Sequence, residues 1–338
     1  WTVCAGGPDD MPSRCARDGA NSYQHLRLRL SIVPPWQDET AEQGVLPRSN
    51  TLILEPVDKA FGAEVAEVDL RDLTKELLGT VREAFSQYAV LVFPDQDLSQ
   101  EDQAKFAAHF GPLEAAPSAI YQDDARQRMQ RDITDVSNID DDGQLWRPDS
   151  RVRQLQVANK LWHTDSSFKH VPALASCLYA RVVPPVGGHT AFADLRGAYD
   201  ALPTDRQAYL KPLIARHTLM ASRRRMGFDD FTAGEAKAMQ AVPQRLVRFL
   251  EDAGRETLYL ASHIEGIDGM DADAAMHLVD ELIAHATQPV FIYRHRWRVG
   301  DLVLWDNRCT MHRAMPFDDM RWGRDLHRAT VSDVANTV

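Results

Sequence analysis

Two residues separated by a single position, His163 and Asp165, are the side chains of this chain best suited to bind a metal ion, and His312 is a third candidate far downstream. Residues i and i+2 of a β-strand point to the same face, so an imidazole nitrogen and a carboxylate oxygen can reach one ion. Two histidines and one carboxylate form the facial set that suits non-haem Fe(II) and leaves coordination positions open for reactants. Each of these residues considered alone is more often an ordinary polar side chain with satisfied hydrogen bonds, so the prediction depends on their surroundings.

A second group of residues is suited to a small dicarboxylate. Arg324 and Arg328 lie four positions apart, and an even spacing keeps both on one side of an extended strand. Guanidinium groups bind carboxylates through two parallel hydrogen bonds, and the hydroxyl of Thr190 can add a further donor. The alternative is a basic strand on the protein surface.

These residues and their neighbours together resemble a known family. The chain carries motifs that occur together in the Fe(II)/2-oxoglutarate-dependent dioxygenases of the taurine and 2,4-dichlorophenoxyacetate type, the TauD/TfdA family. They are His163-x-Asp165, Gly187-Gly188-x-Thr190-x-Phe192, Gly300-Asp301-x-x-x-Trp305-Asp306-Asn307, His312-Arg313 and Arg324-x-x-x-Arg328. The resemblance extends from about residue 51 to residue 333, and the segments 162–168 and 293–297 look most similar to the aryloxyacetate branch.

The resemblance implies both a reaction and the residues that support it. It implies that Fe(II) is bound by His163, Asp165 and His312. It also implies that Thr190 and Arg324 bind the distal carboxylate of 2-oxoglutarate, with Arg328 near the metal-bound end of this cosubstrate. The implied reaction consumes O2 and 2-oxoglutarate and releases succinate and CO2. Hydroxylation beside an ether oxygen of the substrate would then yield a phenol and an oxo-acid.

The residues expected to recognise the substrate differ from those of the aryloxyacetate branch. The loop 113–121 lacks the lysine that this branch carries there, and a second basic residue expected near Gly143-Gln144, upstream of the histidine–aspartate pair, is also missing. Arg223, Arg224 or Arg225, which form a run of three arginines, are candidate replacements for binding the substrate anion, with Arg223 as the first choice. Ile120, Tyr121, Phe228 and Met226 are candidates for an apolar wall. The alternative for the arginine run is surface charge.

Two substrate classes and two other functions fit the pattern. For a dioxygenase, an aryloxyalkanoate-like carboxylate is the first substrate class, and a sulfonate, a sulfate ester or an N-substituted amino acid is the second. A cupin-like metal-binding protein without turnover is an alternative of another class, although such a protein has no use for a dicarboxylate site. A zinc hydrolase is a further alternative, and it would need neither oxygen nor 2-oxoglutarate.

The elements that position these residues are many short strands with helices between them. Strands are predicted at 89–94, 178–183, 291–298, 302–305 and 328–331. Helices are predicted at 74–88, 99–110, 194–202, 204–214, part of 234–250, and 271–286. The order predicts a mixed α and β fold whose core is a double-stranded β-helix (jelly-roll, cupin-like) with helical insertions.

The chain is expected to form one folded domain with an irregular start. Residues 1–48 mix glycine, proline, arginine and serine without any period, which predicts a flexible or extraneous N-terminal extension. Residues 49–338 are predicted to form a single Fe(II)/2-oxoglutarate dioxygenase domain. The polar segment 114–158 is expected to be a solvated loop, or alternatively a lid over the site.

Composition excludes several classes of partner. The net charge of −11 argues against a nucleic-acid or anionic-membrane binder, which would need a basic surface. The four cysteines include no Cys-x-x-Cys pair, and this usage fits a reducing compartment. No apolar run is long enough to span a bilayer. We therefore expect a cytoplasmic protein without nucleic-acid or membrane partners, and the family resemblance implies a homo-oligomer.

Overall fold

A computed structural model of the chain describes most residues from 52 onward. The described residues are 28–29, 52–57, 61–115, 129–140, 142–147, 150, 153 and 156–338. The predicted extension 1–48 lies outside them except for Leu28–Arg29, which form the short strand β1.

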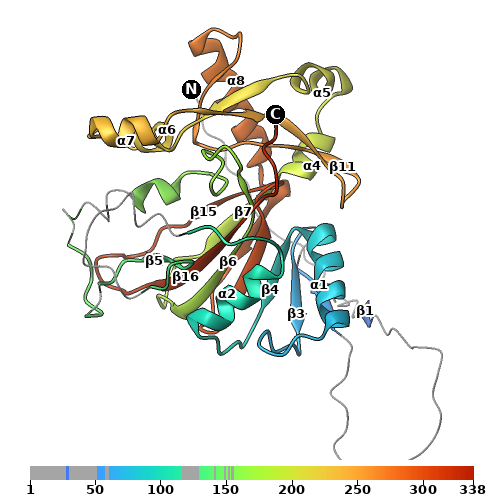
Figure 1. Cartoon of the computed structure of the whole chain (residues 1–338), viewed down its shortest axis with the longest axis vertical. Helices are drawn as coiled ribbons and strands as arrows, with labels where there is room; N and C mark the ends of the chain where they lie inside the picture. Colours follow the sequence, from blue (N-terminus) through green and yellow to red (C-terminus); the bar gives the residue numbers. More distant parts are fainter. Residues whose placement is uncertain are drawn as a thin grey trace, which may run out of the picture.

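An eight-stranded sheet forms the body of the structure (Figure 1). Its strands in spatial order are β1, β2 (Ile53–Pro56), β3 (Ala63–Ala66), β4 (Val90–Phe93), β14 (Leu302–Asp306), β6 (Ala173–Val182), β16 (Asp325–Ser332) and β5 (Thr134–Ser137). All neighbouring pairs are antiparallel except β3 and β4. Strands that are distant in the sequence are therefore neighbours in this sheet, which includes the strand that carries Arg328. The strand that carries His312 belongs to a smaller sheet that lies opposite.

A small sheet packs against the large one. It consists of β13 (Ile292–His295), β7 (Thr190–Asp194) and β15 (Thr310–Ala314), with β7 in the middle. Phe192 of β7 is fully buried in one cluster with Leu178, Val303 and Trp305 of the large sheet. Alternate residues of each strand thus fill the space between two sheets. This arrangement confirms the predicted jelly-roll core.

Two helices cover the outer face of the large sheet, as predicted. They are α1 (Lys75–Tyr88) and α2 (Gln100–Ala108). Thr74 accepts a hydrogen bond at the start of α1, and Ser99 forms a complete capping box at the start of α2. Their apolar sides bury Phe85 and Phe106 against this face of the sheet. Both helices therefore begin directly after a residue whose side chain caps the first helical turn.

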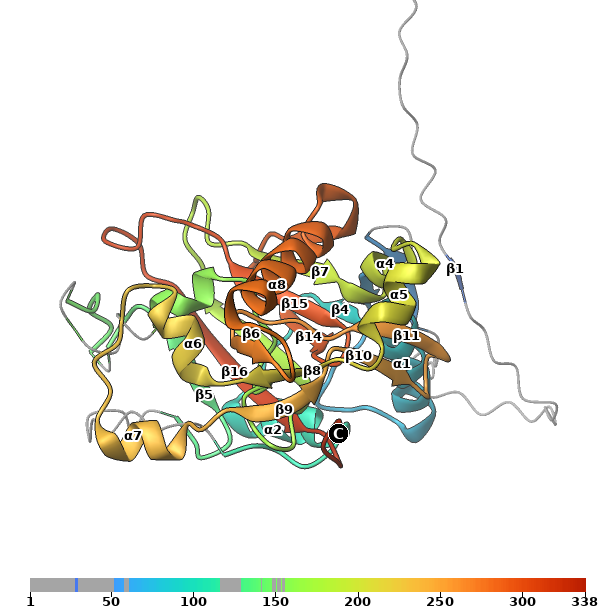
Figure 2. The ribbon, with the colours of Figure 1, turned by 90° about the horizontal axis from the view of Figure 1, so that it is seen from above.

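An insertion of about a hundred residues between β7 and β13 covers the small sheet (Figure 2). Its helices are α4 (Leu195–Asp200), α5 (Thr204–Leu210), α6 (Leu219–Arg224), α7 (Ala233–Ala238), α8 (Ala272–Ala286) and the short η3 (Pro289–Phe291). Its strands are β8 (Ile214–His217), β9 (Val242–Arg245), β10 (Val247–Leu250), β11 (Arg255–Leu258) and β12 (Ile264–Ile267). Leu278, Val279 and Leu282 of α8 pack with Met311 of β15 in one buried cluster. Within the described residues no helix is long and apolar enough to cross a membrane.

For three segments, the secondary structure expected from the sequence differs from the observed one at least in part. The helix predicted to run to Ile214 ends at Leu210, and Ile214 begins β8. The helix expected in part of 234–250 is confirmed by α7, and the strands β9 and β10 follow it. The polar segment 114–158 contains β5, which pairs with β16. In each case a neighbouring strand supplies hydrogen bonds that local propensity does not reveal.

Candidate metal centre and cosubstrate pocket

The two candidate histidines meet across an isolated antiparallel bridge. His163 donates its backbone N–H to the carbonyl of His312 at 3.0 Å, and His312 returns the bond at 2.8 Å. The two imidazole rings lie with their centroids 4.2 Å apart. The expected strand at 163–165 is wrong in detail, because only His163 is paired and Asp165 lies in the turn that follows. Ser166 adopts a left-handed φ of 51°, which turns the chain immediately after Asp165.

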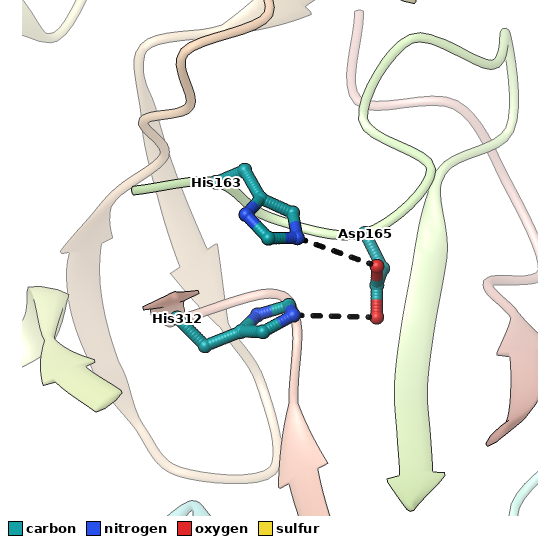
Figure 3. A group of neighbouring side chains, drawn as sticks. All are labelled: His163, Asp165 and His312. Carbon is teal, nitrogen blue, oxygen red and sulfur yellow. Dashed lines mark ion pairs between the residues drawn. The ribbon is translucent and has the colours of Figure 1, made fainter. Parts of the chain in front are cut away.

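The three predicted ligands nevertheless converge (Figure 3). The Nε2 atom of His163 lies 3.9 Å from Oδ1 of Asp165, and the Nε2 atom of His312 lies 3.7 Å from Oδ2. All three side chains are buried, and their candidate ligand atoms lie within 4.8 Å of one another. Ligand atoms this close can contact one ion, since metal bonds to nitrogen and carboxylate oxygen are about 2 Å long. These residues therefore fit a metal ion.

The electrostatics keep all three groups in the protonation state that binds metal. Burial raises the pKa of Asp165, but Arg328 and the two histidines outweigh this effect and lower it to about 2. Burial lowers the pKa of His163 and, more strongly, that of His312. At neutral pH the site thus offers one carboxylate and two neutral imidazoles. The carbonyl of Leu161 accepts from Nδ1 of His163 at 2.8 Å, which leaves the Nε2 lone pair facing Asp165.

A buried hydrogen-bond network fixes the orientation of Asp165. The side-chain oxygen of Asn307 accepts from the backbone N–H of Asp165 at 3.2 Å and from the indole N–H of Trp305 at 3.0 Å. The Asn307 amide nitrogen must then donate to Ser176 Oγ, at 2.9 Å. Ser176 in turn donates to Oδ2 of Asp165 at 2.8 Å. Every bond has one possible direction, because an indole and a backbone N–H can only donate.

Breaking this network is expected to weaken metal binding. Asn307→Asp places a carboxylate against Ser176, which then donates to residue 307 and releases Oδ2 of Asp165. We expect the dissociation constant for Mn(II) to rise about 10- to 100-fold, the usual effect of losing an outer hydrogen bond to a metal ligand. Titration calorimetry measures it, with Thr257→Val, which removes a buried hydroxyl elsewhere, as the control. Equal affinity in Asn307→Asp and the control would show that the network does not act on the metal.

The predicted dicarboxylate residues form a second buried group. Arg324 donates through Nε to the carbonyl of Gly188 at 3.2 Å, and its Nη2 lies 3.5 Å from the hydroxyl of Thr190. Trp297 donates its indole N–H to the same hydroxyl at 3.0 Å. Both neighbours of this hydroxyl are donors, so its own hydrogen remains available for an acceptor. The group therefore presents hydrogen-bond donors and positive charge.

Arg324 has no counter-ion. It is only 7% exposed, and no carboxylate in the described part of the chain lies within ion-pair distance of it. Burial lowers its pKa to about 10. A buried guanidinium without a partner is unfavourable, so the arrangement fits a site completed by a bound anion.

Gly188, two residues before Thr190, lies against both Pro184 and Arg324. Gly188 has a φ of +67°, a conformation that other residues rarely adopt. A Cβ atom there would lie 2.6 Å from Pro184 and 3.6 Å from the Arg324 side chain. Glycine is therefore required by this backbone conformation and by the close approach to Pro184, whereas the distance to Arg324 is an ordinary contact.

One cavity connects the metal residues with the arginine pair. It is lined by His163 and His312, by Thr190, Arg324 and Arg328, and by Val136, Ser137, Asn138, Trp146, Arg153, Gln156, Val157, Asn159, Lys160, Leu178, Trp305, Ala314, Phe317 and Asp319. Arg328 also forms an ion pair with Asp165 at 2.5 Å. Described residues between Val136 and Lys160 thus border the site, which favours a functional role for them over that of a purely solvated loop. Sequence reasoning missed Arg153, Lys160 and Asp319, although two of them are basic residues shortly before His163.

The predicted substrate residues are only partly placed by the structure. Ile120 and Tyr121 lie outside the described residues. Arg223 is buried in α6 and donates to Ser222 at 2.8 Å, and its charge contributes to the lowered pKa of His163. Phe228 packs edge-on against Phe231, with ring centroids 5.2 Å apart. Neither Arg223 nor Phe228 lines the cavity described above, so their role in substrate binding stays a prediction.

Comparisons with known proteins agree with this geometry. Residues 54–330 match the taurine catabolism dioxygenase TauD, TfdA family. The chain is 41% identical over 286 residues to the alpha-ketoglutarate-dependent 2,4-dichlorophenoxyacetate dioxygenase of Cupriavidus pinatubonensis, covering 84% of this chain and 99% of that protein. It is 39% identical over 271 residues to the (S)-phenoxypropionate/alpha-ketoglutarate-dioxygenase of Sphingobium herbicidovorans, covering 78% and 89%.

A solved structure gives the same answer for the fold. The crystal structure of AAD-2 in complex with Mn(II) and N-oxalylglycine superimposes with a TM-score of 0.78 at 42% identity, and the match covers 85% of this chain and 99% of that one. The buried cluster of two histidines and one aspartate, the jelly-roll core and these matches lead to one conclusion. The chain belongs to the TauD/TfdA family and is a dioxygenase that depends on 2-oxoglutarate (alpha-ketoglutarate).

Proposed function

We propose that this protein uses Fe(II), 2-oxoglutarate and O2 to cleave an aryloxyalkanoate into a phenol and an oxo-acid, with succinate and CO2 as coproducts. The observation that supports the reaction most directly is the cavity lined by His163 and His312 of the metal cluster and by the buried Arg324, which has no carboxylate partner among the described residues. The relatives named for 2,4-dichlorophenoxyacetate and phenoxypropionate support the substrate class.

Fe(II) would be held by His163, Asp165 and His312. This ligand set suits non-haem iron and leaves positions free for reactants. When bound, the iron would supply the redox chemistry that couples decarboxylation of the oxo acid to oxygen insertion into a substrate C–H bond. The protein's own contribution is to keep the carboxylate ionised and both imidazoles neutral.

The cosubstrate would be held at its distal carboxylate by Thr190 and Arg324. Both are buried, so water does not compete with the anion for their hydrogen bonds. Arg328, already paired with Asp165, would lie beside the metal-bound end of the cosubstrate. A dianion bridging the two sites would place one carboxylate at each positively charged end of the cavity.

The aryl body of the substrate would pack on the apolar part of the cavity. Val136, Val157, Leu178 and Phe317 line it and can bury an aromatic ring. Hydroxylation of the carbon beside the ether oxygen gives a hemiacetal, which breaks to a phenol and an oxo-acid. Arg223, Phe228, Ile120 and Tyr121 remain further candidates for contact with the substrate. A homo-oligomeric state and a cytoplasmic location also stay predictions.

Succinate formation tests the proposal. Protein loaded with Fe(II) is supplied with O2 and 2-oxoglutarate, and succinate is measured with aryloxyacetates, both enantiomers of aryloxypropionates, alkyl sulfonates, sulfate esters and N-acyl amino acids. We expect the aryloxyalkanoates to raise succinate formation above the rate without substrate, with release of the matching phenol. Stimulation by another class alone would replace the substrate assignment, and no succinate under any condition would favour a metal-binding protein without turnover.

A further inference from the structure

The cavity contains more positive charge than the metal and 2-oxoglutarate sites use. Four cationic side chains line it: Arg153, Lys160, Arg324 and Arg328. Arg328 is paired with Asp165, and Arg324 is the residue proposed above for 2-oxoglutarate. Arg153 and Lys160 are therefore left for another anion.

These two cations share a single carboxylate, that of Asp319. Arg153 contacts Asp319 through Nη2 at 2.8 Å, and Lys160 lies 3.9 Å from the other carboxylate oxygen. Among the described residues of this cluster, two cations and one anion leave one positive charge in excess. The side chains are 19%, 27% and 49% exposed for Arg153, Asp319 and Lys160, so Arg153 lies deepest and Lys160 is closest to solvent.

The contact with Asp319 fixes one edge of the Arg153 guanidinium. Its other terminal nitrogen, Nη1, is buried and has no hydrogen-bond partner among the described residues. A guanidinium held at one edge still offers N–H groups at the other, and an arginine fixed in this way loses little conformational entropy when it binds an anion. Arg153 thus lines the cavity and carries a donor that no described residue satisfies.

The carboxylate partner is itself held in place. Asn138 donates its side-chain N–H groups to the carbonyls of Asp319 and Trp322, both at 2.9 Å, and its side-chain oxygen accepts from the backbone of Arg324 at 2.7 Å. The loop that carries Asp319 is therefore tied to the residue at the 2-oxoglutarate site. This places the two candidate anion sites in a defined relation within one cavity.

We propose that Arg153, oriented by Asp319 and assisted by Lys160, binds the carboxylate of the substrate. The inference rests on the proposed function, since it assigns a part of the same cavity. One uncompensated charge matches a monoanion, as in an aryloxyalkanoate. Apolar Val157 and Phe317 line the same cavity and can contact the aryl body. The site supplies the basic residues that the sequence lacks at the positions expected for the aryloxyacetate branch.

The test compares a substrate with its uncharged analogue. The ratio of kcat/KM for phenoxyacetate to kcat/KM for 2-phenoxyethanol is measured at saturating 2-oxoglutarate. Arg153→Gln is expected to lower this ratio about 10- to 100-fold, the effect of losing a hydrogen bond between charged groups. The anaerobic dissociation constant for 2-oxoglutarate should not change. Arg153→Lys should restore part of the ratio, and Lys160→Gln should lower it less because Lys160 is half exposed.

Arg206→Gln is the matched control, because it removes an arginine from an ion pair between α5 and α8. An unchanged ratio in folded, active Arg153→Gln protein would overturn the inference. A ratio that falls in Arg223→Gln but not in Arg153→Gln protein would also overturn it. If Arg153→Gln does not fold, the same ratio is measured for Lys160→Gln and Arg153→Lys. A ratio equal to that of the wild-type protein in both variants would refute the proposed site. No stimulation of the wild-type protein by any aryloxyalkanoate would instead refute the proposed function. A phenyl alkyl sulfonate tests whether another monoanion is preferred.

Discussion

Replacing Asp165 by alanine is expected to abolish turnover, with kcat reduced at least about a thousandfold. The substitution removes the only negatively charged ligand of the proposed metal site, and His163 and His312 alone offer two neutral nitrogens. It also leaves Arg328 without its partner in the cavity, so positive charge now faces any bound metal ion. His163→Ala should have a comparable effect, because each residue supplies one of three ligands.

The fold should survive both substitutions. Neither His163 nor Asp165 belongs to the apolar clusters between the sheets or under the helices. Succinate formation, Mn(II) affinity by calorimetry and thermal unfolding by circular dichroism separate loss of metal from loss of structure. Asp268→Ala, which breaks an exposed ion pair with Arg216, is the matched control. Full activity in Asp165→Ala protein would refute the metal assignment.

The second large effect is expected at Arg324. Arg324→Gln should raise the dissociation constant for 2-oxoglutarate about 100-fold, because a charge-assisted pair in a buried site is lost. The metal ligands are untouched, so Mn(II) should bind as before. Turnover should return in part at high 2-oxoglutarate concentration, since the groups at the metal remain in place.

Stability separates this role from a structural one. The pKa of Arg324 is lower in the folded protein than in an unfolded chain, so its charged form opposes folding at neutral pH. Arg324→Gln should therefore leave the free energy of unfolding unchanged or raise it while cosubstrate binding weakens. Anaerobic titration with N-oxalylglycine and thermal unfolding provide the two measurements, with Arg216→Gln on the surface as control. Unchanged affinity for both 2-oxoglutarate and its analogue would move the dicarboxylate site elsewhere.

The sequence by itself predicted the cluster of His163, Asp165 and His312 that the structure brings together, the two arginines of the cavity and most of the elements around them. The caps at Thr74 and Ser99 are short-range signals, since each side chain bonds the backbone three residues away. The alternation of buried His295 and Trp297 with exposed arginines likewise shows in the sequence, because strand periodicity is local. The spacing of the motifs then indicated the family, and the family indicated the fold.

Only the tertiary structure decided how distant segments meet. The bridge between His163 and His312, and the path from Trp305 through Asn307 and Ser176 to Asp165, join residues far apart in the chain. Asp165 reaches the site from a turn that no local pattern predicts.

The candidate substrate residues likewise could not be placed in the cavity from the sequence alone. Arg223 and Arg153 are both basic, but only the second lines the cavity, with Asp319 as its partner from a loop 166 residues away. Local propensity depends on neighbours within a few residues, whereas side-chain convergence depends on the packing of the two sheets and the insertion that covers them. For this reason the sequence predicted which chemistry the protein performs, and the fold decided which charged side chains line the cavity.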